Sequence, residues 1–353
     1  MAMDFTEDDA TGEIRPVVWN RAANNLVLLD QTVLPLREEE LTCSSTAELA
    51  EAIGRLAVRG APALGVAGAY GVALALVEAE HKSWSVAERD SAIDLVRNAR
   101  PTAVNLAWGV DQVRPLVNEG LDKVLEAAHQ LAREDEEANK RLSKHGADWL
   151  LARLGDRPLR ALTHCNTGSL ATSTWGTALG ILRELHSRDR LEFVYADETR
   201  PLLQGSRLTA WELKKAGIPY YVQADGAAAS TIMRGLVDFA AIGADRIAYN
   251  GDTANKIGSL GVALACREAG IPFVVAAPSS TVDLSYSDGS DIEIELRPAT
   301  EVTEYGGHQV AAESDRAFNP AFDVTPARLV SAVVTEMGVS EPDRGDNVEG
   351  LVP

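Results

Sequence analysis

Residues 161–169 read Ala161-Leu-Thr-His-Cys-Asn-Thr-Gly-Ser169, and they decide the fold because an apolar run gives way here to a glycine loop. Residues 158–162 predict a short strand, and residues 170–185 repeat apolar side chains at helical spacing. Cys165 is therefore predicted to lie in a strand-to-helix turn. In open parallel sheets such turns line the ligand crevice, and the amides that start the following helix favour an anion.

Cys165 has two interpretations on these residues alone. Many free cysteines are simply small buried apolar residues, whereas a cysteine in a ligand-binding turn is placed for chemistry. The chain has three cysteines, Cys43, Cys165 and Cys266, which lie far apart and lack metal-type pairing. This spacing indicates a reducing compartment without a disulfide framework.

The second half of the chain alternates between strand-like and helix-like segments. The expected strands are residues 160–163, 191–195, 220–223, 239–242 and 273–276, and the clearest helices between them are residues 206–216 and 260–269. This alternation predicts a parallel sheet with helices on both faces. No G-x-G-x-x-G follows a strand and no G-x-x-x-x-G-K-[ST] occurs, so we expect neither a dinucleotide nor a nucleotide cofactor.

The first half has a different pattern. Short apolar runs predict an antiparallel sheet with strands at residues 14–20, 25–29 and 32–36. A Ser45-Thr-Ala-Glu48 capping box and the apolar periodicity that follows predict helices at residues 45–58, 64–77, 87–99 and 110–154. The predicted fold is α/β. A small N-terminal domain with antiparallel strands and helices spans residues 1–150, and a Rossmann-like parallel-sheet domain spans residues 151–353.

Charge and composition restrict the class of partner. The formal net charge is -19 and no long basic run occurs, which argues against binding to nucleic acid. Residues 1–13 lack the basic and apolar regions of a signal peptide, and no run of about 18 uninterrupted apolar residues predicts a membrane span. We therefore expect a cytoplasmic protein without a membrane partner.

Several polar groups are candidates for ligand binding. Arg59-Gly-Ala-Pro precedes an apolar helix and has the residues of a phosphate loop, although an ordinary helix connection has the same composition. Arg100 is a second candidate anion contact or a surface residue. Asp245 follows an apolar run, so it is either a desolvated general base or a helix cap.

The stretch of residues 250–256 ends in Asn255 and Lys256, which suit an anion hook, although these residues alone favour an exposed lysine. His164 is expected on the opposite side of a strand from Cys165, which disfavours a Cys-His nucleophile pair. The six histidines show no metal-ligand spacing, so no metal site is predicted.

The order of these phrases is specific, because Arg59-Gly-Ala-Pro-Ala, Arg100-Pro-Thr-Ala-Val-Asn-Leu, Thr163-His-Cys-Asn-Thr-Gly, Asp197-Glu-Thr-Arg-Pro, Gly243-Ala-Asp-Arg-Ile and Ala254-Asn-Lys-Ile-Gly occur in one chain. The sequence resembles the methylthioribose-1-phosphate isomerases from about Val17 to Gly338. Their superfamily also contains ribose-1,5-bisphosphate isomerases and the regulatory subunits of the exchange factor for initiation factor 2.

The resemblance implies conversion of 5-methylthioribose 1-phosphate into 5-methylthioribulose 1-phosphate in methionine salvage, by a homodimer. It implies that Cys165 is the catalytic thiol and Asp245 the catalytic carboxylate. It also implies that Arg59, Gly60 and Ala61 form the phosphate-side loop, with Arg100, Gln204, Asn255 and Lys256 as further substrate contacts. Proton transfer and hydride shift between C2 and C1 both remain open.

Two alternatives stay open at this point. One is isomerisation of a related pentose 1-phosphate, either 5-deoxyribose 1-phosphate or ribose 1,5-bisphosphate; the second is less favoured because no extra basic cluster is evident for another phosphate. The other is a noncatalytic regulatory protein that binds a sugar phosphate or nucleotide. The presence of both Cys165 and Asp245 argues against that class.

Overall fold

The computed structural model describes residues 13–101 and 103–353. The interpretation of the acidic start therefore falls almost wholly outside the described residues, as does Thr102 of the Arg100 phrase. The chain groups into two compact units, Met1–Glu137 with Gly168–Gly176, and Ala138–Thr167 with Thr177–Pro353. The boundary near residue 150 stays a prediction; in the structure, helix α5 (Leu121–Leu154) contributes to both units.

The smaller unit contains a three-stranded antiparallel sheet in the order β1-β2-β3, formed by β1 (Val17–Asn20), β2 (Asn25–Leu29) and β3 (Glu40–Cys43). The predicted third strand at residues 32–36 is wrong, because this segment forms a turn. The Asp30 carboxylate accepts hydrogen bonds from both the backbone and the hydroxyl of Thr32, and this local bonding competes with strand pairing.

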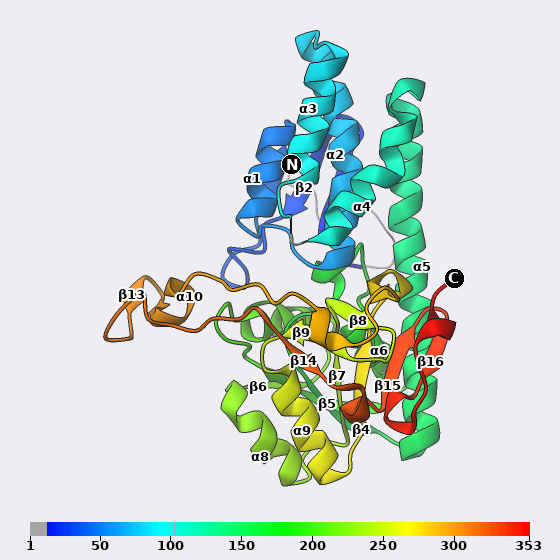
Figure 1. Cartoon of the computed structure of the whole chain (residues 1–353), viewed down its shortest axis with the longest axis vertical. Coiled ribbons are helices and arrows are strands. Elements are labelled where there is room, and N and C mark those ends of the chain that lie inside the picture. The colour runs from blue at the N-terminus through cyan, green and yellow to red at the C-terminus, as the bar shows by residue number, and fades with distance from the viewer. Residues whose placement is uncertain (1–12, 102) are drawn as a thin grey trace. The chain divides into compact units, whose positions relative to one another are not determined.

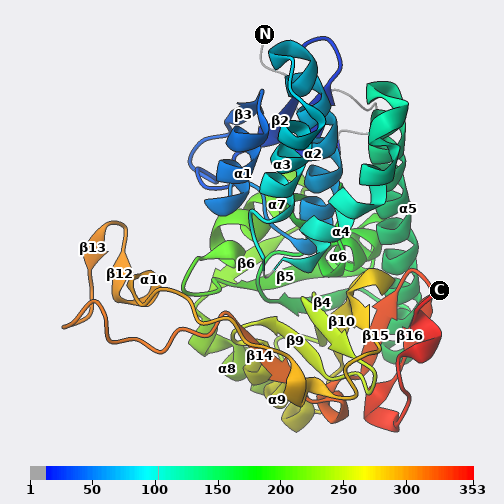
Figure 2. The ribbon, with the colours of Figure 1, turned by 45° about the horizontal axis from the view of Figure 1, so that its top comes forward.

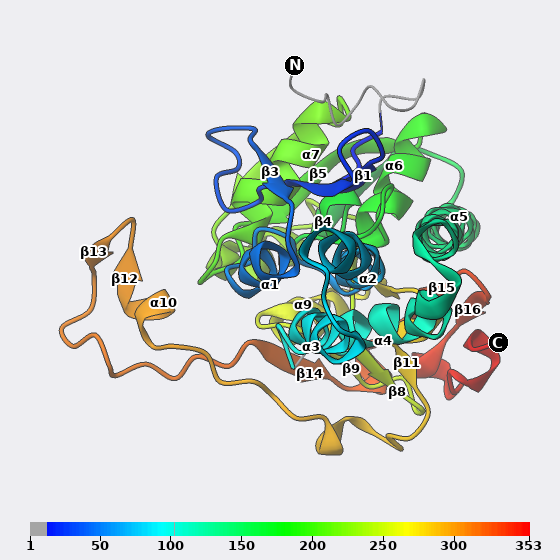
Figure 3. The same cartoon turned by 90° about the horizontal axis from the view of Figure 1, so that it is seen from above.

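Helices pack side by side in this unit (Figure 3); they are α1 (Thr46–Gly54), α2 (Ala61–Lys82), α3 (Val86–Arg97), α4 (Val104–Val113) and the first part of α5. Ser45 and Glu48 form the predicted capping box at the start of α1. Helix α2 is long and apolar enough to cross a membrane, but 83% of its apolar window is buried inside the protein. We therefore interpret it as the core helix of this unit.

Glycines allow α2 and α4 to approach closely. A methyl group added to Gly109 would lie 2.0 Å from the carbonyl oxygen of Gly65, and one added to Gly68 would lie 2.7 Å from that of Leu106. The N-terminal half of α2 therefore packs closely against α4. The loops that precede these helices carry Arg59 and Arg100.

The larger unit is built on a seven-stranded sheet in the order β16-β15-β10-β7-β4-β5-β6 (Figure 1). All its neighbouring strands are parallel except the edge pair β15 and β16. The strands are β4 (Leu159–Thr163), β5 (Leu191–Asp197), β6 (Tyr220–Gln223), β7 (Phe239–Ile242), β10 (Phe273–Ala276), β15 (Ala332–Thr335) and β16 (Gly338–Ser340).

Both faces of this sheet are buried, as a parallel sheet requires. On β7, Phe239 and Ala241 belong to one hydrophobic cluster and Ala240 and Ile242 to the other. The first cluster includes residues of α5, α6 (Ala178–Ser187) and α7 (Ala210–Lys215), and the second includes residues of α8 (Ala228–Met233) and α9 (Ser259–Ala269). The predicted α/β fold, with a small antiparallel-strand region and a Rossmann-like sheet, is confirmed.

A second sheet in this unit has the order β11-β8-β9-β14, formed by β11 (Val282–Asp283), β8 (Arg246–Ala248), β9 (Thr253–Lys256) and β14 (Phe322–Thr325). The segment before β14 extends as an arm (Figure 2) that carries α10 (Thr300–Thr303), β12 (Glu304–Tyr305) and β13 (His308–Gln309). Sequence periodicity did not reveal these short pieces, because each is only two to four residues long.

The predicted helix at residues 170–185 begins later than expected, at Ala178. Residues Gly168–Gly176 instead belong to the smaller unit, where Ser173 bonds to the Asp135 carboxylate and the Thr174 hydroxyl bonds to the Ile14 carbonyl. These polar contacts replace helical hydrogen bonding. The apolar spacing alone could not reveal this competition.

The close approach of α2 and α4 yields a stability prediction. Gly109→Ala should lower the unfolding temperature through a steric cost of about 1–3 kcal/mol, although alanine is the better helix former. Gly54→Ala is the control, since nothing lies within 4 Å of its added methyl group, and it should leave the unfolding temperature unchanged or raise it. Equal unfolding temperatures for Gly109→Ala and the wild type would contradict the close crossing.

Candidate active site

Three adjacent strands of the larger sheet end beside one another. Strand β4 lies between β5 and β7, and all three are parallel, so their carboxyl ends meet at one edge. The loops that follow carry Cys165, Gln204 and Asp245. The loops after β4 and β7 touch, because a methyl group added to Gly243 would lie 2.5 Å from the Thr167 side chain. The edge matches the usual ligand-binding position in such sheets.

Cys165 is buried and its backbone is held in the left-handed region, with φ of 65°. This conformation costs a non-glycine residue about 1–2 kcal/mol, and such strain is concentrated at functional sites. The Cys165 N–H donates to the hydroxyl of Thr199 at 2.8 Å, and its carbonyl accepts from the hydroxyl of Thr209 at 2.6 Å. Hydrogen bonds on both sides therefore compensate the strained geometry.

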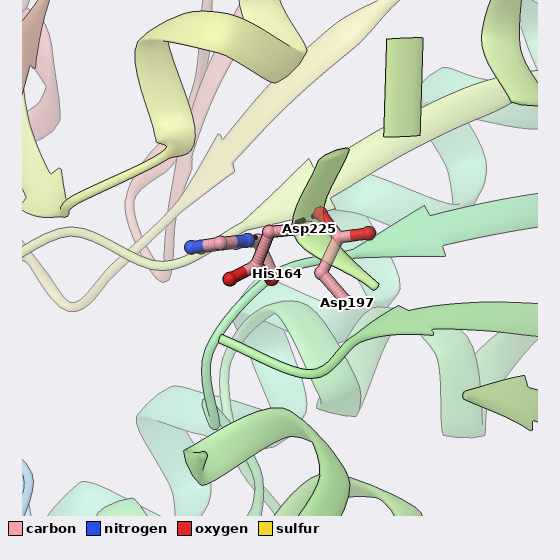
Figure 4. A group of neighbouring side chains, drawn as sticks. All are labelled: His164, Asp197 and Asp225. Atoms are coloured by element: carbon pink, nitrogen blue, oxygen red, sulfur yellow. Dashed lines mark hydrogen bonds and ion pairs between the residues drawn. The ribbon is translucent and has the colours of Figure 1, made fainter. Parts of the chain in front are cut away.

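His164 and Asp197 form a buried pair directly before this cysteine. His164 Nδ1 lies 3.0 Å from the Asp197 carboxylate, and Nε2 lies 2.8 Å from the Ile257 carbonyl oxygen. The other Asp197 oxygen accepts from the Gln223 amide at 2.8 Å. Figure 4 shows His164 with the carboxyl groups of Asp197 and Asp225 around it.

These contacts define the charge of the pair. A carbonyl oxygen only accepts, so Nε2 carries a proton, and a second proton must lie between Nδ1 and the carboxyl group. Burial alone would lower the pKa of His164, but the hydrogen bond and charge of Asp197 outweigh it and raise the pKa. Burial also raises the pKa of Asp197, against the opposing effect of His164. The pair therefore has no net charge and retains the proton shared between Nδ1 and the carboxyl group.

His164, Asp197 and Asp225 are close enough together to hold a metal ion. However, both nitrogens of His164 already have partners, and the two Asp225 oxygens accept the backbone N–H groups of Thr199 and Arg200 at 2.7 Å each. A metal would have to displace these hydrogen bonds. The donor chemistry therefore favours a structural network at this position.

The loop after β5 contains Gln204, which is 4% exposed. Among the residues that the structure describes, its side-chain oxygen has no hydrogen-bond partner. The next residue must be glycine, because a methyl group on Gly205 would lie 1.6 Å from the Asp197 carbonyl oxygen. A buried acceptor without a donor costs about 1–3 kcal/mol of folding free energy, so this oxygen is suited to accept a hydrogen bond from a ligand hydroxyl group.

Asp245 differs from the sequence expectation in one respect. Its backbone N–H bonds to the Ala254 carbonyl at 2.9 Å, but its side chain is exposed rather than desolvated. The apolar run before it belongs to β7, which ends at Ile242, so the chain leaves the core before Asp245. The neighbouring core therefore does not bury this carboxylate.

Asn255 and Lys256 close strand β9, two residues before the Gly258 cap of α9. The Asn255 amide donates to the Ser259 hydroxyl at 2.8 Å, and the Lys256 ammonium donates to the Ala321 carbonyl at 2.9 Å. The ammonium also lies 4.7 Å from the centre of the Phe322 ring. Both side chains are thus held in place at the end of a strand.

In the smaller unit, Gly60 caps the start of α2 with φ of 92° and Pro62 occupies its first turn. Any side chain at Gly60 would collide with the backbone of Ala171. Arg59 and Ala61 flank this contact, and Arg100 lies in the loop before α4. Arg59 directly precedes the helix start in the sequence, and a helix start with an arginine is a favourable setting for a phosphate.

Comparison with known proteins identifies the family. The model of the initiation factor 2 subunit family matches residues 57–342. A methylthioribose-1-phosphate isomerase from Alkalilimnicola ehrlichii is 48% identical over 348 residues, covering 96% of this chain and 98% of that protein. The chain belongs to the methylthioribose-1-phosphate isomerase family. The family resemblance seen in the sequence is thereby confirmed.

Solved structures extend this family relationship to the fold. A 5-methylthioribose 1-phosphate isomerase from Pyrococcus horikoshii has a TM-score of 0.85 and 39% identity, and the match covers 97% of this chain and 96% of that one. An A. fulgidus structure described as translation initiation factor eIF-2B, subunit delta, has a TM-score of 0.84 and 40% identity, covering 96% and 98%. Structural likeness alone therefore does not distinguish the isomerase from the regulatory class.

One isomerase relative is longer than this chain. A probable bifunctional methylthioribose-1-phosphate isomerase/methylthioribulose-1-phosphate dehydratase from Nocardia farcinica is 50% identical over 324 residues, which cover 92% of this chain. The chain spans only 58% of that relative's length. The dehydratase activity in its name is therefore not carried over.

Sequence reasoning did not identify Thr199, Thr209 or the pairing of His164 with Asp197. It placed His164 on a strand, but β4 ends at Thr163, so strand alternation does not apply to it. His164 is unavailable to Cys165 because Asp197 and Ile257 occupy its nitrogens. The stretch of residues 161–169 was recognised in the sequence, but no pattern connects it with Asp197, Thr199 and Thr209.

The His164–Asp197 pair predicts a pH effect on stability. The pKa of His164 is higher in the folded than in the unfolded chain. The stability that protonated His164 contributes is therefore fully present below about pH 6.5 and is lost as pH rises from there through the folded-state pKa. In Asp197→Asn the charge partner is absent and His164 should be neutral. Between pH 6.5 and 8.5 the wild type should therefore lose stability relative to Asp197→Asn, by up to about 1.4 kcal/mol per pH unit.

Asp238→Asn is the control for urea unfolding across this pH range. The hydrogen bonds from Arg160 and Arg157 outweigh burial and lower the pKa of Asp238 to about 2, so its effect should be constant above pH 6. A constant difference between the wild type and Asp197→Asn would contradict the retained proton.

Proposed function

We propose that this protein converts 5-methylthioribose 1-phosphate into 5-methylthioribulose 1-phosphate in methionine salvage, with Cys165 and Asp245 as its acid-base groups. The observation that carries the site assignment is the left-handed, doubly hydrogen-bonded backbone of Cys165 at the sheet edge. The loops that bear Gln204 and Asp245 follow the two neighbouring strands. Family membership supports the reaction.

The substrate explains why two acid-base groups are needed. Phosphate on C1 prevents the sugar from opening to a free aldehyde, so opening requires a proton on the ring oxygen. A hydrogen must then move from C2 to C1, and the product has the same composition as the substrate. A thiol, with an ordinary pKa of about 8.5, carries a proton to donate, and a carboxylate accepts one.

Asp245 requires a further condition. Because its side chain is exposed in the ligand-free chain, a bound sugar must supply the desolvation that makes a carboxylate an effective base. Proton transfer through an enol-type intermediate and direct hydride transfer both remain compatible with these residues. Loss of a C2 deuterium label to water would favour proton transfer.

The remaining residues suit the rest of the substrate. Arg59, Gly60 and Ala61 are proposed to bind the phosphate through the start of α2, with Arg100, Asn255 and Lys256 as further polar contacts. The buried Gln204 oxygen is proposed to accept a sugar hydroxyl. No metal or nicotinamide is required in this proposal, since the hydrogen that leaves C2 is transferred to C1 of the same molecule and Cys165 and Asp245 supply the acid and the base.

Cys165→Ser and Asp245→Asn should each lower kcat by about 100- to 10,000-fold, the usual loss for an acid-base group, while leaving phosphate binding intact. Cys43→Ser and Cys266→Ser are the controls. Burial raises the pKa of both thiols to about 12, so neither should affect turnover comparably. Near-normal activity of either site variant would remove that residue from the mechanism.

The same assay separates the alternatives. We expect the methylthio sugar to be preferred over 5-deoxyribose 1-phosphate and ribose 1,5-bisphosphate. Preference for the bisphosphate would overturn the substrate assignment. Binding of sugar phosphate without turnover between pH 6 and 9 would instead support the noncatalytic regulatory class.

A cytoplasmic homodimer is also proposed, on the basis of family resemblance. The apolar segments at residues 64–77 and 329–334 are largely buried in this chain's own cores, so they do not support an interface. The arm offers better support, since Leu296 is 67% and Phe318 82% exposed. Light scattering should give twice the mass of one chain, and Phe318→Glu should lower it; a monomeric wild type would refute the dimer.

A further inference from the structure

The peptide groups on both sides of Cys165 are held by hydroxyl groups of other loops. Cys165 has φ of 65°, a conformation that a residue with a side chain adopts only where its surroundings impose it. The backbone conformation also sets the direction in which the thiol projects. Whatever imposes this conformation therefore determines where the sulfur lies.

Thr199 holds the N-terminal side. Its hydroxyl accepts the Cys165 N–H at 2.8 Å and donates to the Asp197 carbonyl at 3.0 Å, so both functions of the hydroxyl are used. The side chain is fully buried. Valine at this position has nearly the same shape but offers neither hydrogen bond.

Thr209 holds the C-terminal side. Its buried hydroxyl donates to the Cys165 carbonyl at 2.6 Å and accepts from the Asn166 amide at 3.3 Å. Asn166 is anchored in turn by a bond of 2.7 Å to the Glu212 carboxylate. The residue after the cysteine is therefore fixed together with the carbonyl.

The two threonines are themselves held rigidly. Thr199 has φ of 64°, and its N–H donates to the Asp225 carboxylate at 2.7 Å. Thr209 ends the π-helical turn Gly205–Thr209 that leads into α7. Neither hydroxyl can follow the cysteine if the loop moves.

We propose that Thr199 and Thr209 are positioning residues for the Cys165 thiol, which their hydroxyls hold in its left-handed backbone conformation. This inference rests on the proposed function, because it assumes that Cys165 takes part in the reaction. It assigns no direct contact with the substrate to either threonine. Misplacement of a reacting group by about 1 Å can cost 100-fold in rate, so loss of a hydroxyl should affect kcat much more than KM.

The test compares Thr199→Val and Thr209→Val with the serine variants at the same positions. Each valine variant should lower kcat about 10- to 100-fold while KM changes less than about threefold. Serine restores the hydroxyl, so each serine variant should stay within about threefold of the wild-type kcat. A role in stability alone would not produce this division between kcat and KM.

Thr335→Val is the matched control. Thr335 is also fully buried, and its hydroxyl likewise accepts a backbone N–H, from Met337, and donates to a backbone carbonyl, that of Leu351. It lies on β15, whose partners β10 and β16 are separate from β4. Its valine variant should lose stability without losing kcat.

The outcomes separate this inference from the proposed function. An inactive wild type would overturn the proposed function, and an active Cys165→Ser variant would remove the role of the thiol. If the wild type is active and Cys165→Ser is not, wild-type kcat in both valine variants overturns the positioning role. A decrease in kcat as large in Thr335→Val would also overturn it. If valine prevents folding, the alanine variants replace it with the same expected loss.

Discussion

The buried Asp197 carboxyl group is the constraint on which the site depends. It lies at the end of β5, pairs with His164 after β4 and receives the amide of Gln223 at the end of β6. The backbone carbonyl of Asp197 accepts a hydrogen bond from the Thr199 hydroxyl and leaves no room for a side chain at Gly205. One residue thus couples three strand ends to the loop of Cys165, and the shared proton lets this happen without a net buried charge.

Much of this architecture was predictable from the sequence, and the failures have identifiable causes. Strands β6, β7 and β10 matched the expected bounds, because β7 and β10 are uninterrupted apolar runs and β6 is an aromatic and β-branched run that ends at Gln223. The predictions for residues 32–36 and 170–177 failed because local hydrogen bonds outweigh their apolar spacing: the Asp30 carboxylate accepts from Thr32, and the Ser173 and Thr174 hydroxyls donate. Such bonds join residues that no periodicity connects.

The candidate site was predictable in part for the same reason. Cys165 was expected in a turn after a strand and Asp245 after an apolar run, and the topology places the loops that carry them after the neighbouring strands β4 and β7. Their environments did not follow from position. The hydrogen bonds of the Thr199 and Thr209 hydroxyls to Cys165 join residues 34 and 44 positions apart. The exposure of Asp245 depends on where its loop leaves the core.

Residues Gly168–Gly176 interrupt the larger unit and complete the smaller one. A fragment ending at Glu137 would lack the Leu170 carbonyl that receives the buried Gln31 amide, and the Ser173 groups that bond to Asp135. The smaller unit is therefore not a module that recombination can transfer by one cut. A fragment comprising the smaller unit alone would have to include residues Gly168–Gly176 as well as the N-terminal segment.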